Sequence, residues 1–172
     1  PVTKGRPLTE KAMGSTGRAY YLPEENAIYL PVNYPGKMAH LARIDKNTGR
    51  MEKMGAVVAP KLYTVTSMAM DKASKKLYLS NKNSDWRGLE VIDSKNGRRK
   101  QLMRFTRTGD LVYNPHDKSI WGIQTNNGRT AIVRIPEPYK EIETLYTLEY
   151  TISIFNLDIS PDGKFLSASL SE

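Results

Sequence analysis

The sequence contains no cysteine, which excludes disulfide bonds, thiolate metal ligands and a cysteine nucleophile. No apolar run approaches the roughly 20 residues that a membrane-spanning helix needs, and the segment that starts at Pro1 lacks the basic-then-apolar pattern of a signal peptide. No window shows a sustained helical period with capping residues at its ends. We therefore expect little helix and no membrane span in this segment.

Signatures of the common catalytic sites are also absent. The sequence has no Gly-x-Ser-x-Gly elbow, His-Glu-x-x-His zinc pair, Ser-x-x-Lys motif or phosphate-binding glycine loop. We expect its only histidines, His40 and His116, at opposite ends of the sheets, so we predict no metal site, because most metal sites need three or four convergent ligands. We assign no catalytic residue and no cofactor, and leave open whether the protein is an enzyme.

The balance of charge is basic, with 26 Lys and Arg residues against 18 Asp and Glu and a net charge of +8. A positive net charge of this size can favour binding to nucleic acid or to a lipid surface. However, the basic residues recur in every segment and cluster only between Arg98 and Arg107. This pattern favours an evenly charged, solvated surface, and we do not expect nucleic acid as a partner.

A repeat organises the rest of the chain. Four phrases share one pattern, a strand end, a polar turn and a second strand, and they begin at Leu22, Met70, Tyr113 and Ile159. The apolar anchors of the second strands recur at intervals of 43 to 49 residues, which is the period of a four-stranded propeller blade. These anchors are Tyr29, Tyr78, Trp121 and Leu166. We expect them at equivalent buried positions between blades.

Turn residues recur in phase with this repeat. Asp45 to Gly49 and Asp93 to Gly97 each supply an Asp that caps free N–H groups and a Gly that accepts positive φ. The sequence therefore predicts an all-β fold, a β-propeller segment of about three and a half four-stranded blades from a larger propeller. We place the blade units at 17-55, 64-103, 109-148 and 154-172, the last one incomplete.

Expected strands follow from this phase. They are Ala19 to Leu22, Ala27 to Leu30, Ser67 to Met70, Lys76 to Ser80, Leu89 to Asp93, Arg99 to Met103, Ser119 to Ile123 and Thr130 to Ile135. We interpret residues 1-16 as the end of a preceding blade, with Gly5 to Thr9 as its last strand. Because both ends interrupt blades, we expect the remaining blades or domains of the same protein, or a complementing chain, to cover the open edges.

Two stretches resemble known repeats. Ile159-Ser-Pro-Asp-Gly-Lys-Phe-Leu-Ser167 is similar to the Ser-Pro-Asp-Gly-Lys signature of TolB-like propellers, a family of WD40-like bacterial repeats. Lys76 to Asn81 with Gly88 to Gly97 resembles the related YVTN-type repeat. The resemblance implies a bacterial propeller, periplasmic or secreted, that commonly binds a protein partner or gates a neighbouring enzyme domain. The motif is specific for fold and says little about function.

The loop Asn81 to Arg87 is the most informative non-repeating feature. A turn does not require Trp86, and Trp beside Arg is frequent at binding hot spots. The b-to-c and d-to-a loops of a propeller share one face, so we predict a polar, aromatic and cationic binding surface there. Its candidates are Tyr34, Trp86, Arg87, Arg104, Arg107, Asn126 and Arg129. The alternative is that Trp86 folds back over its own blade as a plug.

Four carboxylates at strand ends, Asp45, Asp93, Asp110 and Asp158, are interpreted as turn caps rather than as an acid/base pair or a calcium site. The leading functional hypothesis is a non-catalytic binding or scaffold propeller. A second is a propeller that gates a serine oligopeptidase or zinc peptidase domain whose catalytic residues lie outside this chain. A third is a propeller enzyme such as a lactonase, with a metal on the axis.

Overall fold

The structure, a computed structural model, describes residues 5–9, 15–16, 18–34, 40–56, 65–82, 87–150 and 152–171. Within these ranges the chain is built from antiparallel strands, and its one helical element is the single 3-10 turn Pro23–Glu25. The sequence has no helical periods with capping residues, and the all-β fold that this absence predicted is confirmed.

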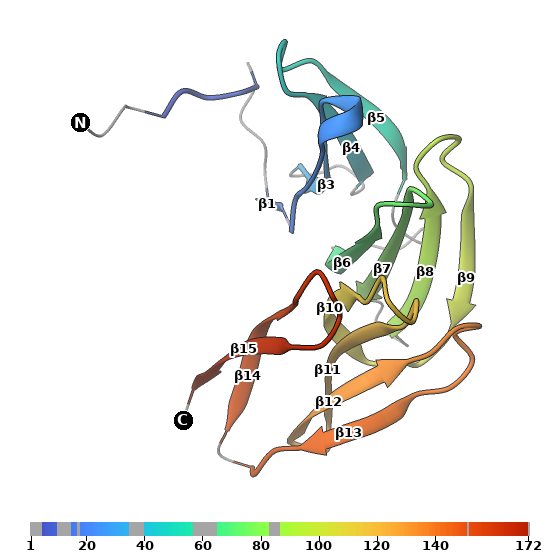
Figure 1. Cartoon of the computed structure of the whole chain (residues 1–172), viewed down its shortest axis with the longest axis vertical. Helices are drawn as coiled ribbons and strands as arrows, with labels where there is room; N and C mark the ends of the chain where they lie inside the picture. Colours follow the sequence, from blue (N-terminus) through green and yellow to red (C-terminus); the bar gives the residue numbers. More distant parts are fainter. Residues whose placement is uncertain are drawn as a thin grey trace.

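The strands form four sheets in chain order (Figure 1). The first contains β1 (Ser15–Thr16), β2 (Tyr20–Leu22), β3 (Ala27–Asn33), β4 (His40–Asp45) and β5 (Met51–Ala56). The second contains β6 (Val65–Asp71), β7 (Lys76–Lys82), β8 (Arg87–Asp93) and β9 (Arg99–Met103). The third contains β10 (Thr108–Tyr113), β11 (Ile120–Asn126), β12 (Arg129–Ile135) and β13 (Glu143–Thr147). The fourth contains β14 (Ser153–Ile159) and β15 (Leu166–Ser171).

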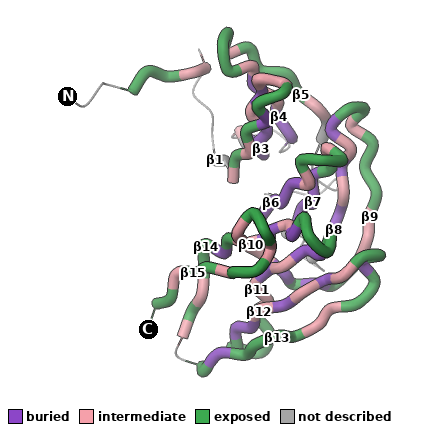
Figure 2. Tube along the Cα trace, in the orientation of Figure 1, coloured by how far each residue is buried: buried purple, intermediate pink, exposed green. Residues whose placement is uncertain are grey.

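The sheets stand side by side in an arc that is open on one side (Figure 1). β6, β10 and β14 are the first strands of three successive sheets, and β10 contacts both β6 and β14 along the concave side. The last strands, β5, β9 and β13, lie on the convex side, where Figure 2 shows mainly exposed and half-buried residues. This is a partial β-propeller, as predicted, and we call the sheets blades 1 to 4 and their strands a to d from the centre outwards.

Apolar clusters between successive blades hold the arc together. Tyr29 and Leu41 of blade 1 pack against Met68, Leu77 and other residues of blade 2. Tyr78 and Leu89 of blade 2 pack in the same way against Leu111, Ile120 and Ile135 of blade 3. A four-stranded sheet has two apolar faces and cannot cover either by itself, so burial requires a neighbouring blade on each side.

The anchors of the repeat are confirmed in part. Tyr29 and Tyr78 are 2% and 3% exposed and face the following blade. Trp121 has the equivalent register, but it is half-buried, because blade 4 has only two strands to cover it.

Leu166 is not equivalent to these three residues, which corrects the sequence prediction. It pairs with Ile159 as Ile120 pairs with Tyr113, so its counterpart in blade 3 is Ile120, and Ser167 takes the position of Trp121. Side chains alternate between the two faces of a strand, so this difference of one residue places Leu166 on the opposite face.

The first described segment also corrects a prediction. Residues 5–9 form no strand, so they are not a strand d of a preceding blade. Instead, Leu8 packs against the cluster of Leu30, Val32, Ala42 and Ile44 on the outer face of blade 1. The segment thus covers apolar surface of blade 1.

The predicted turn chemistry is confirmed at the c-to-d hairpins. Asp45 Oδ1 accepts hydrogen bonds from the N–H groups of Asn47 and Thr48 at 2.9 and 2.8 Å. Asp93 Oδ1 accepts one from the N–H group of Lys95 at 2.8 Å. The closing Gly49 and Gly97 have φ of 72° and 69°, which a side chain would disfavour.

Candidate functional site

The two ends of the blades carry different connections. The a–b and c–d turns lie at one end, which we call the turn face. The b–c and d–a connections lie at the other end, and we call residues 104–107, 126–129 and 148–150 the loop face. Side-chain and backbone bonds tie its three segments together. Gln124 Nε2 donates to the carbonyl oxygen of Thr106 at 2.7 Å, and the N–H group of Leu148 donates to the carbonyl oxygen of Thr130 at 2.8 Å.

Residues Arg104–Arg107 present two side chains outward around a buried one. Thr106 is 1% exposed, whereas Phe105 is 64% exposed and Arg107 is also exposed. Both outward residues have positive φ, 57° for Phe105 and 48° for Arg107. This conformation is unfavourable for a residue with a bulky side chain and is enriched at functional sites. The backbone therefore holds an aromatic ring and a cation in solvent.

The second segment pairs a cation with an aromatic ring. The guanidinium carbon of Arg129 lies 4.5 Å from the centre of the Tyr150 ring, within range of a cation–π interaction. Tyr150 is 64% exposed, and Asn126, which pairs with Arg129 at the end of the β11–β12 ladder, is exposed. The ring fixes the guanidinium in position without neutralising its charge.

The other predicted site residues are placed differently. Arg104 Nε donates to Gln101 Oε1 at 3.4 Å beside Phe105. Tyr34 lies at the start of the b–c connection of blade 1, where it is half-buried and its ring stacks on that of His40, with ring centres 5.9 Å apart. Trp86 lies outside the described residues, and of Arg87 only the backbone at the start of β8 is described.

Sequence reasoning missed Phe105 and Tyr150. The signal was available, since each is an aromatic residue in a polar connection outside any alternating strand pattern. The positive φ of Phe105 was not predictable, because turns that place φ above zero use Gly, Asn or Asp far more often.

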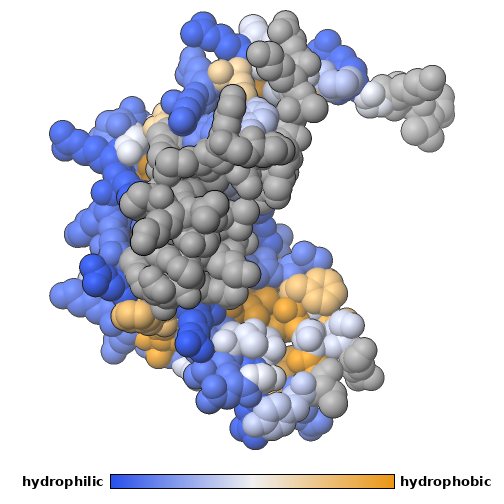
Figure 3. All heavy atoms as spheres, turned by 180° about the vertical axis from the view of Figure 1, so that it is seen from behind, coloured by the Kyte–Doolittle hydropathy of each residue, from blue (hydrophilic) through white to orange (hydrophobic). Residues whose placement is uncertain are grey.

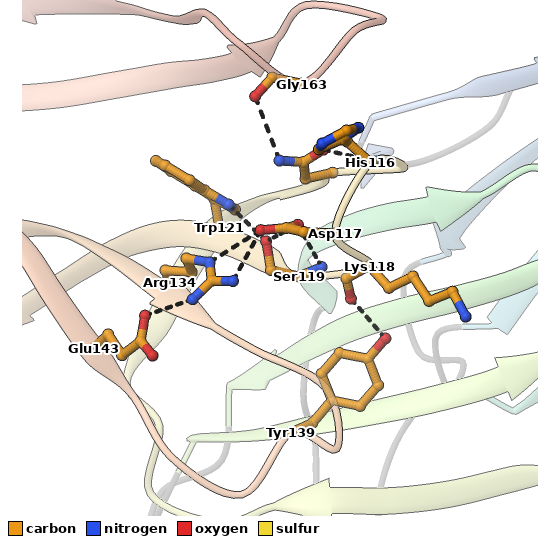
Figure 4. Close-up of polar contacts among 10 residues, drawn as sticks. His116, Asp117, Lys118, Ser119, Trp121, Arg134, Tyr139, Glu143 and Gly163 are labelled. Atoms are coloured by element: carbon orange, nitrogen blue, oxygen red, sulfur yellow. Dashed lines mark hydrogen bonds and ion pairs between the residues drawn. The ribbon is translucent and has the colours of Figure 1, made fainter.

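Carboxylates on the turn face serve the fold. In the a–b turn of blade 3, Asp117 accepts hydrogen bonds from Ser119, and Arg134 lies between Asp117 and Glu143 at 2.9 and 2.7 Å (Figure 4). Trp121 Nε1 donates to Ser119 Oγ at 2.8 Å. Each carboxylate faces a donor or a cation, so none here forms an acid/base pair.

Similar contacts continue around the turn face. Lys75 bonds to Glu25, and this hydrogen bond is the main cause that lowers the pKa of the Glu25 carboxyl. At Asp45, the bonds from Thr48 lower the pKa of the carboxyl below its usual value. Both groups are therefore stabilised as anions, a structural use of charge.

A cavity of about 690 Å³ lies between the a strands of the four blades. Arg18, at its wall, donates to the carbonyl oxygen of Leu157 at 2.5 Å and lies 3.6 Å from Asp110. Asp110 Oδ2 in turn accepts a hydrogen bond from the N–H group of Leu157 at 2.7 Å. The interpretation of Asp110 as a turn cap is wrong, because it lies inside β10 and joins blade 3 to blade 4.

Asp158 is the fourth of the strand-end carboxylates. Its side chain is 74% exposed, and its Oδ1 lies 4.0 Å from Nη1 of Arg18. Among the described residues, its Oδ1 accepts a hydrogen bond from the N–H group of the adjacent Ile159 at 2.9 Å. It caps no tight turn, so the turn-cap interpretation is wrong here as well. Among the described residues, no group of three His, Cys, Asp or Glu side chains is placed to hold a metal ion.

No protein-family model and no curated protein matches the chain. Solved structures do. Oligogalacturonate lyase in complex with manganese matches with a TM-score of 0.72 and 17% identity over 95% of this chain and 49% of its own. TolB from Acinetobacter baumannii matches with a TM-score of 0.70 and 14% identity over 90% of this chain and 37% of its own.

The chain has a TolB-like β-propeller fold. A prolyl endopeptidase structure also matches, with a TM-score of 0.60 and 16% identity over 92% of this chain and 26% of its own. The chain therefore spans less than half the length of each of these TolB-like and other propeller proteins. At these identities the likeness establishes the fold alone. In the described ranges, the structure contains no helix long and apolar enough to cross a membrane.

Proposed function

We propose that this TolB-like propeller segment is a non-catalytic binding or scaffold module that engages a partner through its loop face. One observation carries the proposal: Phe105 and Arg107 are held outward by positive φ around the buried Thr106. An exposed aromatic ring in a strained backbone has no role in the core, and aromatic residues and Arg are enriched at protein interfaces. Trp86, Arg87, Arg104, Asn126 and Arg129 belong to the proposed surface, and Tyr34 would extend it at the b–c connection of blade 1.

An alternative within the same fold is a propeller that gates an attached peptidase domain. The similarity to prolyl endopeptidases supports it at the level of fold. The complete coding sequence separates the two proposals. A Gly-x-Ser-x-Gly elbow or a His-Glu-x-x-His pair outside residues 1–172 would favour gating.

We propose a periplasmic or secreted bacterial location, supported by the likeness to TolB. We also propose that remaining blades or domains of the same protein, or a complementing chain, cover the outer edge of β15. β7 and β11 each pair with a strand on both sides, whereas within the described ranges β15 pairs with β14 alone. Phe155 and Leu170 of blade 4 are 44% and 64% exposed. Figure 3 shows apolar surface in this lower part of the molecule.

A displayed library of random peptides, panned on the whole chain, tests the binding proposal. Selected peptides should bind at least tenfold more weakly to the double variant Phe105→Ala/Tyr150→Ala. They should bind unchanged to Tyr21→Ala, a matched exposed tyrosine beside the a–b turn of blade 1. Peptides that bind both variants like the unaltered chain would show that the loop face is not the binding surface.

A further inference from the structure

The two faces of the arc differ in how their charges are balanced. On the turn face, carboxylates recur because an Asp at the start of a tight turn accepts backbone N–H groups, as Asp45, Asp71 and Asp93 do. Lysines and arginines of the same turns lie among them, so this face carries both signs. The repeat therefore confines most acidic side chains to one end of the blades.

The loop face has few acidic side chains to balance its arginines. Its three described segments contain Arg104, Arg107 and Arg129 and one acidic residue, Glu149. Within the described chain, Arg107 makes no hydrogen bond or ion pair, and Arg129 stacks on Tyr150 rather than on a carboxylate. A guanidinium has five N–H donors and can donate two parallel hydrogen bonds to one carboxylate. Arg107 and Arg129 can therefore bind anionic groups.

The spacing of these groups favours an extended ligand. Thr106 is tied to Gln124, which lies two residues before Asn126 on β11, and adjacent strand residues rise about 3.4 Å. The Arg107 and Arg129 segments are thus neighbours at one end of blade 3. Phe105 is two residues from Arg107 and Tyr150 contacts Arg129, and these exposed rings supply apolar contact that a simple polyanion would not need.

From this we propose that the loop face binds an acidic segment of a protein partner, with Asp or Glu carboxylates on Arg107 and Arg129 and apolar side chains on Phe105 and Tyr150. This inference rests on the proposed function and adds the chemistry of the partner. Charge of this kind speeds encounter and sets specificity, and its effect weakens as salt rises.

The test uses fluorescence anisotropy with a labelled 20-residue poly-L-glutamate peptide, a second peptide of alternating Glu and Leu, and an oligogalacturonate of similar charge. Binding is measured at low and at physiological salt. The double variant Arg107→Gln/Arg129→Gln is compared with Arg50→Gln/Arg98→Gln. The control removes the same charge from exposed c–d turns on the opposite face.

We expect the Glu/Leu peptide to bind more tightly than poly-L-glutamate. It should lose about tenfold in affinity in the loop-face variant and less than about twofold in the control, a difference of roughly one decade in Kd. Equal losses in both variants would show non-specific attraction to a basic chain and overturn the proposal. Oligogalacturonate binding as tightly, with the same dependence on Arg107 and Arg129, would overturn it in favour of an acidic saccharide.

The outcome also separates this inference from the proposed function. If binding of neutral displayed peptides requires Phe105 and Tyr150 while neither acidic peptide binds, the loop face is a binding surface and the proposal of an acidic partner is refuted. If no probe depends on the loop face, both proposals fail.

Discussion

Asn114 of blade 3 donates a hydrogen bond from Nδ2 to the carbonyl oxygen of Gly163 in blade 4, at 3.4 Å. The same side chain accepts the N–H group of His116 at 2.9 Å, so one buried amide shapes its own a–b turn and reaches the next. Tyr113 makes the corresponding link from blade 3 back to Asp71 of blade 2 at 3.1 Å. Polar links between successive turns thus reinforce the apolar packing between blades.

Replacing Gly163 by Ala should destabilise blade 4. An added Cβ would lie 2.3 Å from Asn114 Oδ1, and Gly163 has φ of 70°. We expect a loss of about 1 to 3 kcal/mol from strain and steric overlap, measured by urea unfolding. Gly109→Ala is the matched control, because a Cβ there meets no atom within 4 Å. Equal midpoints for the two variants would contradict the contact.

Glu25 should make stability depend on pH. Hydrogen bonds from Lys75 and Tyr29 lower the pKa of Glu25 in the folded chain below 4.5, so the folded state binds fewer protons than the unfolded state. Its contribution is present above pH 4.5 and is lost as pH falls through the lower folded pKa. The difference in urea midpoint between the unaltered chain and Glu25→Gln should therefore be large near neutral pH and shrink at about pH 3. A difference that is constant with pH would refute this role.

Within the described ranges β15 is paired on one side alone, and its other edge should cause self-association of the 172-residue chain. Leu166–Ser171 carries no charged residue and no proline, the usual protections of an edge strand. Sedimentation velocity should show mass increasing with concentration, and Ser167→Lys should reduce the effect. Thr125→Lys, which adds the same charge to the internal strand β11, should not. A monodisperse, cooperatively unfolding monomer would contradict the proposal that further strands or a second chain cover this edge.

Substitution of Trp86 and Arg87 distinguishes a binding loop from a loop in which Trp86 packs back over its own blade. Replacing both by Ala should weaken binding of the selected peptides while changing the thermal midpoint little, because a loop surface carries little core packing. If instead stability falls strongly and binding persists, the plug interpretation holds.

The sequence was sufficient for the repeat and for most strands, because alternation and Asp/Gly turns report local structure. It failed by one residue at Leu166, where Phe165 and Leu166 are adjacent apolar residues and the pattern cannot say which one faces the core. The link from Arg18 to Asp110 and Leu157 could not be predicted, because it joins blades 1, 3 and 4 across the concave side.

The site was predicted less completely than the fold. Arg107, Asn126 and Arg129 do lie at one end of blade 3, since loop position follows from strand order. Phe105 and Tyr150 were missed because their exposure depends on backbone conformation and on neighbouring loops. Position in the repeat predicts which end of a blade a residue occupies, but not which way its side chain points.

The most direct test of the loop face is a two-dimensional ¹H–¹⁵N NMR titration of the chain with a peptide selected from the displayed library. The amide signals that shift should belong to residues 104–107, 126–129 and 148–150 and to Trp86 and Arg87, with the turn-face amides unchanged. Shifts concentrated at the a–b turns, at residues 72–75, 116–118 and 162–164, would contradict the proposal that the loop face binds the peptide.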